Sequence, residues 1–133
     1  MPFRRILCVG CFDILHYGHL LHLEASYAMG DELVVGITRN RCVDKGAGRP
    51  YNDERLRAAL VQAIWCVEKV RLVDSSLQAL KLFNPDIFAL GADYKGNVLP
   101  EDRAYCKRNG IKIRFTNKRR MSSTDIYDRL RQR

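Results

Sequence analysis

Five short apolar runs alternate with amphipathic segments along the 133-residue chain, and this alternation constrains the fold more than any other feature. The runs are rich in Val, Ile and Leu and show little polar alternation, as parallel strands buried on both faces do. Gly30 and Gly110 stand where C-terminal helix caps are expected. Strands are predicted at residues 5–10, 32–38, 67–73, 86–91 and 111–116, and helices at residues 18–29, 53–65, 77–83, 100–109 and 123–132.

This order of elements predicts an α/β fold. We expect a single domain over residues 1–133, built as a Rossmann-like, doubly wound, parallel five-stranded sheet with helices on both faces. Ligands of such sheets bind beyond the carboxyl ends of the strands. No apolar run approaches the roughly 18 residues that span a bilayer, and the first residues lack the long apolar region of a signal peptide. We therefore expect no membrane association and a cytoplasmic location.

Five cysteines are scattered through the chain, and Cys8 and Cys11 have the C-x-x-C spacing of a redox pair or of half a zinc site. A structural zinc needs four ligands, and no second C-x-x-C or H-x₃-H pair follows. In a thioredoxin-like pair the first cysteine is exposed at a helix start. Cys8 instead falls inside the first apolar run, which predicts a buried small hydrophobe. We expect no metal site from these cysteines.

The net charge of +8 is unevenly distributed. Residues 1–102 hold 12 Lys and Arg against 13 Asp and Glu, whereas residues 103–133 hold 11 against 2. The basic segment could be a nucleic-acid face, the wall of a pocket for a polyanionic small molecule, or a solvated helix. A nucleic-acid module usually interleaves basic and aromatic residues, and only Tyr105, Phe115 and Tyr127 are available here. We therefore expect no nucleic-acid partner, although a nucleic-acid-binding module remains the alternative class.

Two histidines follow the end of the first predicted strand. Gly10 allows a sharp turn and a close approach of a ligand to the backbone, and the helix start near Gly18 supplies free N–H groups that favour an anion. His16 and His19 are three residues apart across this helix start, so both can point to the same side. His22, on the body of the helix, is expected to be structural. The turn therefore predicts a phosphate site.

The segment G-C-F-D-I-L-H-Y-G-H, residues 10–19, is similar to the H-x-G-H signature of the cytidylyltransferase-like nucleotidyltransferases, and Ser122-Ser123-Thr124 resembles their S-T-T motif. The resemblance implies an enzyme that joins a nucleoside triphosphate, ATP or CTP, to a small phosphorylated acceptor and releases pyrophosphate. It assigns to His16 and His19 the stabilisation of charge on the α-phosphate. The nucleotide-binding residues that it implies are Gly10, Cys11, Phe12, Gly18, Arg120, Ser122, Ser123 and Thr124.

Arg120 departs from the family pattern, which usually has glycine two residues before the first serine. Lys118, Arg119 and Arg120 would line the triphosphate pocket, which accounts for part of the basic charge. The same departure leaves open a nucleotide sensor that binds without catalysing transfer. Mg²⁺ is expected with the triphosphate, without a dedicated carboxylate cage. Asp13 would either bond the turn or lie near that ion.

Two further segments bear on the substrate. Lys45-Gly46-Ala47-Gly48-Arg49-Pro50, followed by Arg57, resembles the K-G-x-x-R-P…R pattern of the heptose 1-phosphate adenylyltransferases. The resemblance implies that Lys45 is catalytic at the phosphates and that Arg57 helps to position them.

Gly91-Ala92-Asp93-Tyr94-Lys95 resembles the G-G-D-Y-K of the same enzymes, which implies that Asp93 and Tyr94 bind acceptor or phosphate. Glycerol-3-phosphate cytidylyltransferases, the alternative, tend to have tryptophan at position 94 and arginine at position 65. A homodimer is also implied, and the apolar side of the first helix could form its interface.

Overall fold

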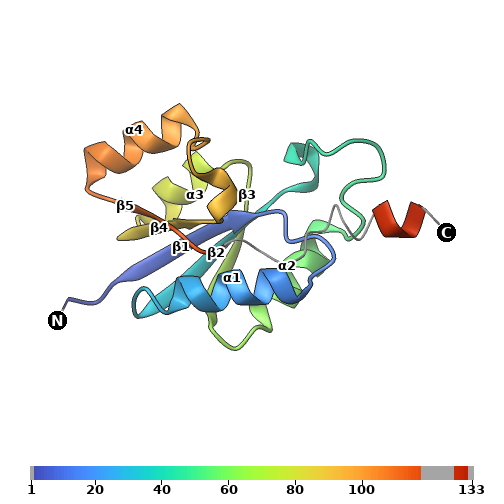
Figure 1. The fold of residues 1–133 in the computed structure, drawn as a ribbon, viewed down its shortest axis with the longest axis horizontal. Helices are drawn as coiled ribbons and strands as arrows, with labels where there is room; N and C mark the ends of the chain where they lie inside the picture. The colour runs from blue at the N-terminus through green and yellow to red at the C-terminus, as the bar shows by residue number, and fades with distance from the viewer. Residues whose placement is uncertain (1, 118–127, 132–133) are drawn as a thin grey trace.

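Five strands form one all-parallel sheet in the order β3-β2-β1-β4-β5. This computed structural model describes residues 2–117 and 128–131 (Figure 1). The strands are β1 Arg5–Gly10, β2 Glu32–Thr38, β3 Val67–Val73, β4 Ile87–Leu90 and β5 Lys112–Phe115. The first three begin and end as predicted, and the last two are one residue shorter at each end. The parallel sheet with β1 at its centre confirms the predicted fold class.

Helices cover both faces of the sheet. The helices are α1 Tyr17–Tyr27, α2 Glu54–Gln62, α3 Ser76–Phe83 and α4 Pro100–Asn109, and two 3₁₀ turns are η1 Asn40–Cys42 and η2 Ala92–Tyr94. Figure 1 shows α1 and α2 on one side and α3 and α4 on the other. Of the last predicted helix, residues 128–131 are described and are helical. None of the described helices is long and apolar enough to cross a membrane.

The core has two layers because successive residues of a strand point to opposite faces. In β1, Ile6 and Cys8 pack with Leu23 of α1, whereas Leu7 packs with Leu80 of α3. Cys8 is fully buried, as predicted, and burial raises the pKa of its thiol to about 12. The cysteine therefore contributes core volume and has little thiolate character.

Two glycines behave differently at helix ends. Gly110 caps α4 with φ 68°, in the left-handed region where glycine is favoured, as predicted. The prediction for Gly30 was wrong, because α1 ends with Ala28 as its C-cap in the ordinary right-handed conformation. A Cβ at position 30 would lie 2.9 Å from the carbonyl oxygen of Arg4, so the absence of a side chain there lets the backbone approach the start of β1.

Replacing Cys8 by alanine should lower the free energy of unfolding by about 1 kcal/mol or slightly more, because a buried sulfur is removed from a packed core. Cys42 is exposed, so Cys42→Ala is the matched control and should cost less than about 0.5 kcal/mol. Urea unfolding of both variants measures the difference. Equal effects would contradict the assignment of Cys8 to the core.

Candidate active site at the carboxyl ends of the strands

The start of α1 is closed by a reciprocal pair of histidine hydrogen bonds. His16 is the N-cap residue, and its Nδ1 accepts a hydrogen bond from the backbone N–H of Gly18 at 3.0 Å. His19 Nδ1 in turn accepts from the backbone N–H of His16 at 3.3 Å. The arrangement is a capping box in which imidazoles replace the usual hydroxyl and carboxylate. The two histidines therefore define where the helix begins.

The same bonds determine the protonation of both rings. A ring nitrogen that accepts a hydrogen bond carries no proton, so the neutral form of each histidine has its proton on Nε2. The rings stack with their centroids 3.9 Å apart and their planes 29° apart. The capping box thus directs the protons of His16 and His19 to Nε2 and fixes both rings beside a helix N-terminus, where a phosphate is favoured electrostatically.

Phe12 supports this arrangement from the preceding turn. It is buried, and its ring centroid lies 5.4 Å from that of His19. Phe12 and Ile14 have φ values of 52° and 49°, in the left-handed region that costs free energy for residues other than glycine. A Cβ on Gly10 would lie 3.0 Å from the Phe12 ring. Gly10 therefore makes room for the aromatic ring, and the sharp turn falls on the residues that follow it.

A buried arginine ties this turn to the segment after β2. Arg57 of α2 is fully buried, and its Nη1 donates to the Cys11 carbonyl at 2.7 Å. Its Nε donates to the Asn52 carbonyl at 3.0 Å, and its Nη2 donates to Asn40 Oδ1 at 2.7 Å. Arg57 was expected to help position phosphate. The structure places its guanidinium behind the site, where it holds the loops that form the walls.

Asp13 makes a second connection between the same segments. It is buried, and its two carboxylate oxygens accept the backbone N–H groups of Tyr51 and Asn52 at 2.7 and 2.9 Å. Of the two roles considered for Asp13, bonding the turn is the one that these contacts support. The loop that carries Lys45 is therefore anchored at its far end to the residues just before His16.

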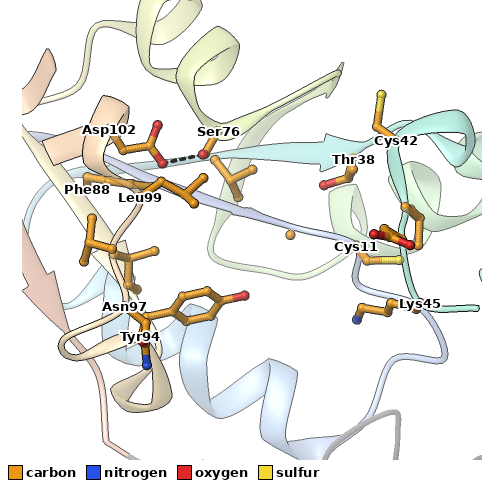
Figure 2. A pocket seen from close by; sticks show the side chains of 16 residues that line it. Cys11, Thr38, Cys42, Lys45, Ser76, Phe88, Tyr94, Asn97, Leu99 and Asp102 are labelled. Atoms are coloured by element: carbon orange, nitrogen blue, oxygen red, sulfur yellow. Dashed lines mark hydrogen bonds between the residues drawn. The ribbon is translucent and has the colours of Figure 1, made fainter. Parts of the chain in front are cut away.

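Two adjoining cavities open at the carboxyl ends of the strands. The larger is a cleft of roughly 340 Å³ on the side of α3 and α4, and Figure 2 shows it extending from Cys11 and Lys45 to Ser76 and Asp102. The smaller lies on the side of α1, and Phe12, His19 and His22 contribute to its lining. Residues shared by both cavities are Val9, Gly10, Cys11, Lys45, Leu90 and Tyr94. A ligand could therefore extend from one cavity into the other across the end of β1.

Cys11 lies where the two cavities meet. Burial raises the pKa of its thiol, and the positive charges of Arg57 and Lys45 partly oppose this effect. Cys8 and Cys11 are both free thiols. Within residues 2–117 and 128–131, no group of three His, Cys, Asp or Glu residues could hold a metal ion. The two cysteines of the C-x-x-C spacing therefore have separate positions: Cys8 lies in the core, and Cys11 lines the cleft.

The structure places the predicted site residues in different surroundings. Gly10, Cys11, Lys45 and Tyr94 line both cavities, and Phe12 and His19 line the smaller one. His16 and Gly18 lie at the start of α1 and line neither cavity. Asp93 is exposed and does not line either cavity, although it directly precedes Tyr94. Arg120, Ser122, Ser123 and Thr124 lie outside the described residues, as do Lys118 and Arg119.

The cleft also contains polar residues that the sequence analysis did not identify: Thr38, Asp44, Ser76, Asn97 and Asp102. Thr38 ends β2, so the rule that ligands bind beyond strand ends could have found it. Asp102 follows Pro100 at the start of a helix, where a carboxylate usually stabilises the helix dipole at the surface. Nothing in the local pattern distinguishes it from such a residue.

His22, expected to be structural, pairs through Nδ1 with Thr116 Oγ1 at 2.7 Å and also lines the smaller cavity.

Comparison with known proteins agrees with this geometry. The cytidylyltransferase-like family model matches residues 7–129. The chain belongs to the cytidylyltransferase-like family. The bifunctional protein HldE of Campylobacter fetus subsp. fetus is 43% identical over 91 residues, which are 65% of this chain and 20% of that protein. The chain thus spans about one fifth of the length of such relatives.

Other relatives cover the chain more completely. The FAD synthase of Aciduliprofundum boonei is 32% identical over 124 residues, covering 92% of this chain and 83% of that enzyme. The crystal structure of a lipopolysaccharide core biosynthesis protein from Thermoplasma volcanium superposes with a TM-score of 0.72 and 27% identity, covering 91% of this chain and all of the other. The fold of the family therefore extends over nearly all of the chain.

Arg57→Lys should lower the free energy of unfolding by about 2–3 kcal/mol, because a lysine ammonium cannot reach the three partners of the guanidinium and leaves buried carbonyls unsatisfied. Arg55→Lys, on the exposed side of the same helix, should change it by less than about 0.5 kcal/mol. Chemical denaturation of the two variants tests this. If Arg57→Lys were as stable as Arg55→Lys, Arg57 would not be the anchor of these loops.

Proposed function

We propose that this protein is a nucleotidyltransferase that transfers a nucleoside monophosphate from ATP or CTP to a small phosphorylated acceptor and releases pyrophosphate. The observation that carries the proposal is the histidine capping box, which fixes both imidazoles beside the N-terminus of α1 and directs their ring protons to Nε2. In the reaction, a phosphate oxygen of the acceptor attacks the α-phosphorus while the bond to the bridging oxygen breaks. Charge accumulates on the α-phosphate oxygens, where such donors stabilise it.

Lys45 is proposed to assist from the loop above β1. It lines both cavities, so its ammonium group can reach phosphates bound on either side of Cys11. A fixed positive charge at this junction would offset repulsion between the anionic acceptor and the anionic triphosphate. The basic residues 118–120 and the serines that follow are proposed to hold the β- and γ-phosphates. Mg²⁺ is proposed to arrive with the triphosphate, coordinated mainly by phosphate oxygens.

For the acceptor, we propose a sugar phosphate and, most specifically, adenylyl transfer to heptose 1-phosphate. The K-G-x-x-R-P and G-x-D-Y-K resemblances support this, and the structural neighbour named for lipopolysaccharide core biosynthesis is consistent with it. The cleft volume is also at the small end of ligand pockets, which range from about 300 to 1,000 Å³. A small acceptor fits such a cleft better than a large one.

Two alternative acceptors follow from other observations. Glycerol 3-phosphate, with CTP as donor, fits the same small cleft and was the alternative from the sequence. A flavin acceptor is supported by the identity to an FAD synthase over most of the chain.

A homodimer is also proposed. Leu23 of α1 is fully buried against the sheet, so on this helix the partly exposed Leu20 and Leu21 would have to contribute to the interface.

The direct test is to incubate the protein and Mg²⁺ with each nucleoside triphosphate and with heptose 1-phosphate, glycerol 3-phosphate or FMN, and to measure pyrophosphate release. We expect turnover with ATP and heptose 1-phosphate. Nucleotide binding without pyrophosphate release for any acceptor would support the sensor instead. Tight, strongly salt-dependent binding of oligonucleotides would support the nucleic-acid module.

The two roles of His16 can be separated by substitution. Asparagine is a good N-cap, so His16→Asn should keep the helix start within about 0.5 kcal/mol of wild type, whereas His16→Ala should cost about 1 kcal/mol. Both should lower kcat by roughly 10²–10³, as the loss of one preorganised donor does, and so should His19→Ala. Tyr17→Phe, an exposed residue in the same turn, is the control and should remain active. Near-normal kcat in the His16→Asn and His19→Ala variants would refute the assignment.

A further inference from the structure

The end of the cleft distant from the histidines holds a buried carboxylate. Asp102, in the first turn of α4, is only 3% exposed and lines the cleft. Ser76 Oγ, at the start of α3, donates a hydrogen bond to Asp102 Oδ2 (Figure 2). The two helix starts are thus joined at the edge of the cleft.

The other carboxylate oxygen, Oδ1, is buried and has no hydrogen-bond partner within residues 2–117 and 128–131. A buried carboxylate oxygen without a partner is costly, and native proteins rarely leave one without a functional reason. Stabilisation of the helix dipole does not require this burial, because Glu101 in the same turn is exposed and serves that purpose. The position of Asp102 therefore calls for a ligand group.

The surroundings of Asp102 favour an uncharged polar ligand with an apolar side. Phe88 and Leu90 of β4 form a buried apolar wall of the cleft, and Asn97 contributes a side-chain amide. Burial raises the pKa of Asp102, opposed in part by the hydrogen bond from Ser76. A sugar or polyol presents C–H groups to such a wall and hydroxyl groups to the polar side chains.

The two ends of the cleft carry different side chains, which suits a molecule with two chemically different ends. Lys45 and Cys11 lie at the end next to the histidines, and Ser76 and Asp102 lie at the other (Figure 2). An acceptor whose phosphate lies near Lys45 would direct its opposite end toward Asp102. A hydroxyl there can donate to the Asp102 carboxylate and can also accept a hydrogen bond, whereas an ammonium group can only donate.

We propose that Asp102, oriented by Ser76, binds a hydroxyl group of the acceptor and selects polyhydroxylated phosphates over phosphates that lack hydroxyls. The inference rests on the proposed nucleotidyl transfer and extends it to the part of the acceptor that does not react. Asp102 is thus a specificity-determining residue, distant from the histidines at which the transfer takes place.

The test compares Asp102→Asn with Glu101→Gln, a matched carboxylate-to-amide change one residue away on the exposed side of α4. KM and kcat are measured by pyrophosphate release with heptose 1-phosphate, hexyl phosphate and phosphoethanolamine as acceptors. Binding of heptose 1-phosphate without nucleotide is measured by calorimetry. For Asp102→Asn we expect KM for heptose 1-phosphate to rise about 10- to 100-fold, the effect of losing a hydrogen bond to a charged group, with KM for the triphosphate unchanged.

Wild type should prefer heptose 1-phosphate to hexyl phosphate, and Asp102→Asn should lose most of that preference. Ser76→Ala should act in the same direction by roughly 3-fold or more, because it frees the carboxylate to turn away. This variant decides the question if Asp102→Asn does not fold. Kinetics like those of Glu101→Gln would overturn the inference while leaving the transferase intact. An Asp102-dependent preference for phosphoethanolamine would overturn the choice of a hydroxyl.

If wild type releases no pyrophosphate with any acceptor, the proposed function fails. The hydroxyl site at Asp102 is then tested only by the calorimetric binding of heptose 1-phosphate. Binding of heptose 1-phosphate that weakens at least about 10-fold in Asp102→Asn, and is unchanged in Glu101→Gln, would support a hydroxyl site. Equal binding by all three proteins, or no binding by wild type, would overturn it.

Discussion

The buried guanidinium of Arg57 is the interaction on which the site depends. One side chain on α2 holds the carbonyl of Cys11, which begins the turn after β1, and the carbonyl of Asn52, which closes the Lys45 loop. It also holds Asn40, just after β2. These segments carry little regular hydrogen bonding of their own, so a fully buried donor with several directed N–H groups is what gives them one arrangement. Asp13 reinforces the same connection from the opposite direction.

The capping box fixes the orientation and the proton position of the two imidazole rings. Each imidazole uses Nδ1 to satisfy a backbone N–H at the start of α1 and thereby directs its proton to Nε2. In the proposed function, helix capping and phosphate binding are served by the same two side chains. The left-handed conformations of Phe12 and Ile14 show that the turn is held in a strained form by its surroundings, which is common where a site needs fixed geometry.

The two cavities meet at the carboxyl end of β1. One lies on the α1 face, next to His19, and the other on the α3 and α4 face, and they share the end of β1. Transfer to an acceptor requires the attacking and leaving oxygens on opposite sides of the α-phosphate. A doubly wound sheet supplies this arrangement because β1, at its centre, has helices on both sides. The proposed meeting of both substrates at the Gly10–Cys11 turn follows from this position in the sheet.

The sequence by itself determined the element order, the parallel sheet and the place of the candidate site, because apolar periodicity and strand-to-helix turns are local properties. It also identified the residues next to the first turn, where Gly10, His16 and His19 lie close together in the chain. Only the tertiary structure decided that Arg57 lies behind the site, that Gly30 is required by the nearby Arg4 carbonyl, and that Asp102 is buried beside Ser76. These features depend on contacts between residues that are distant in the chain, such as Arg57 and Cys11, 46 positions apart, and Asp102 and Ser76, 26 positions apart. No local pattern encodes which oxygen or carbonyl will be buried.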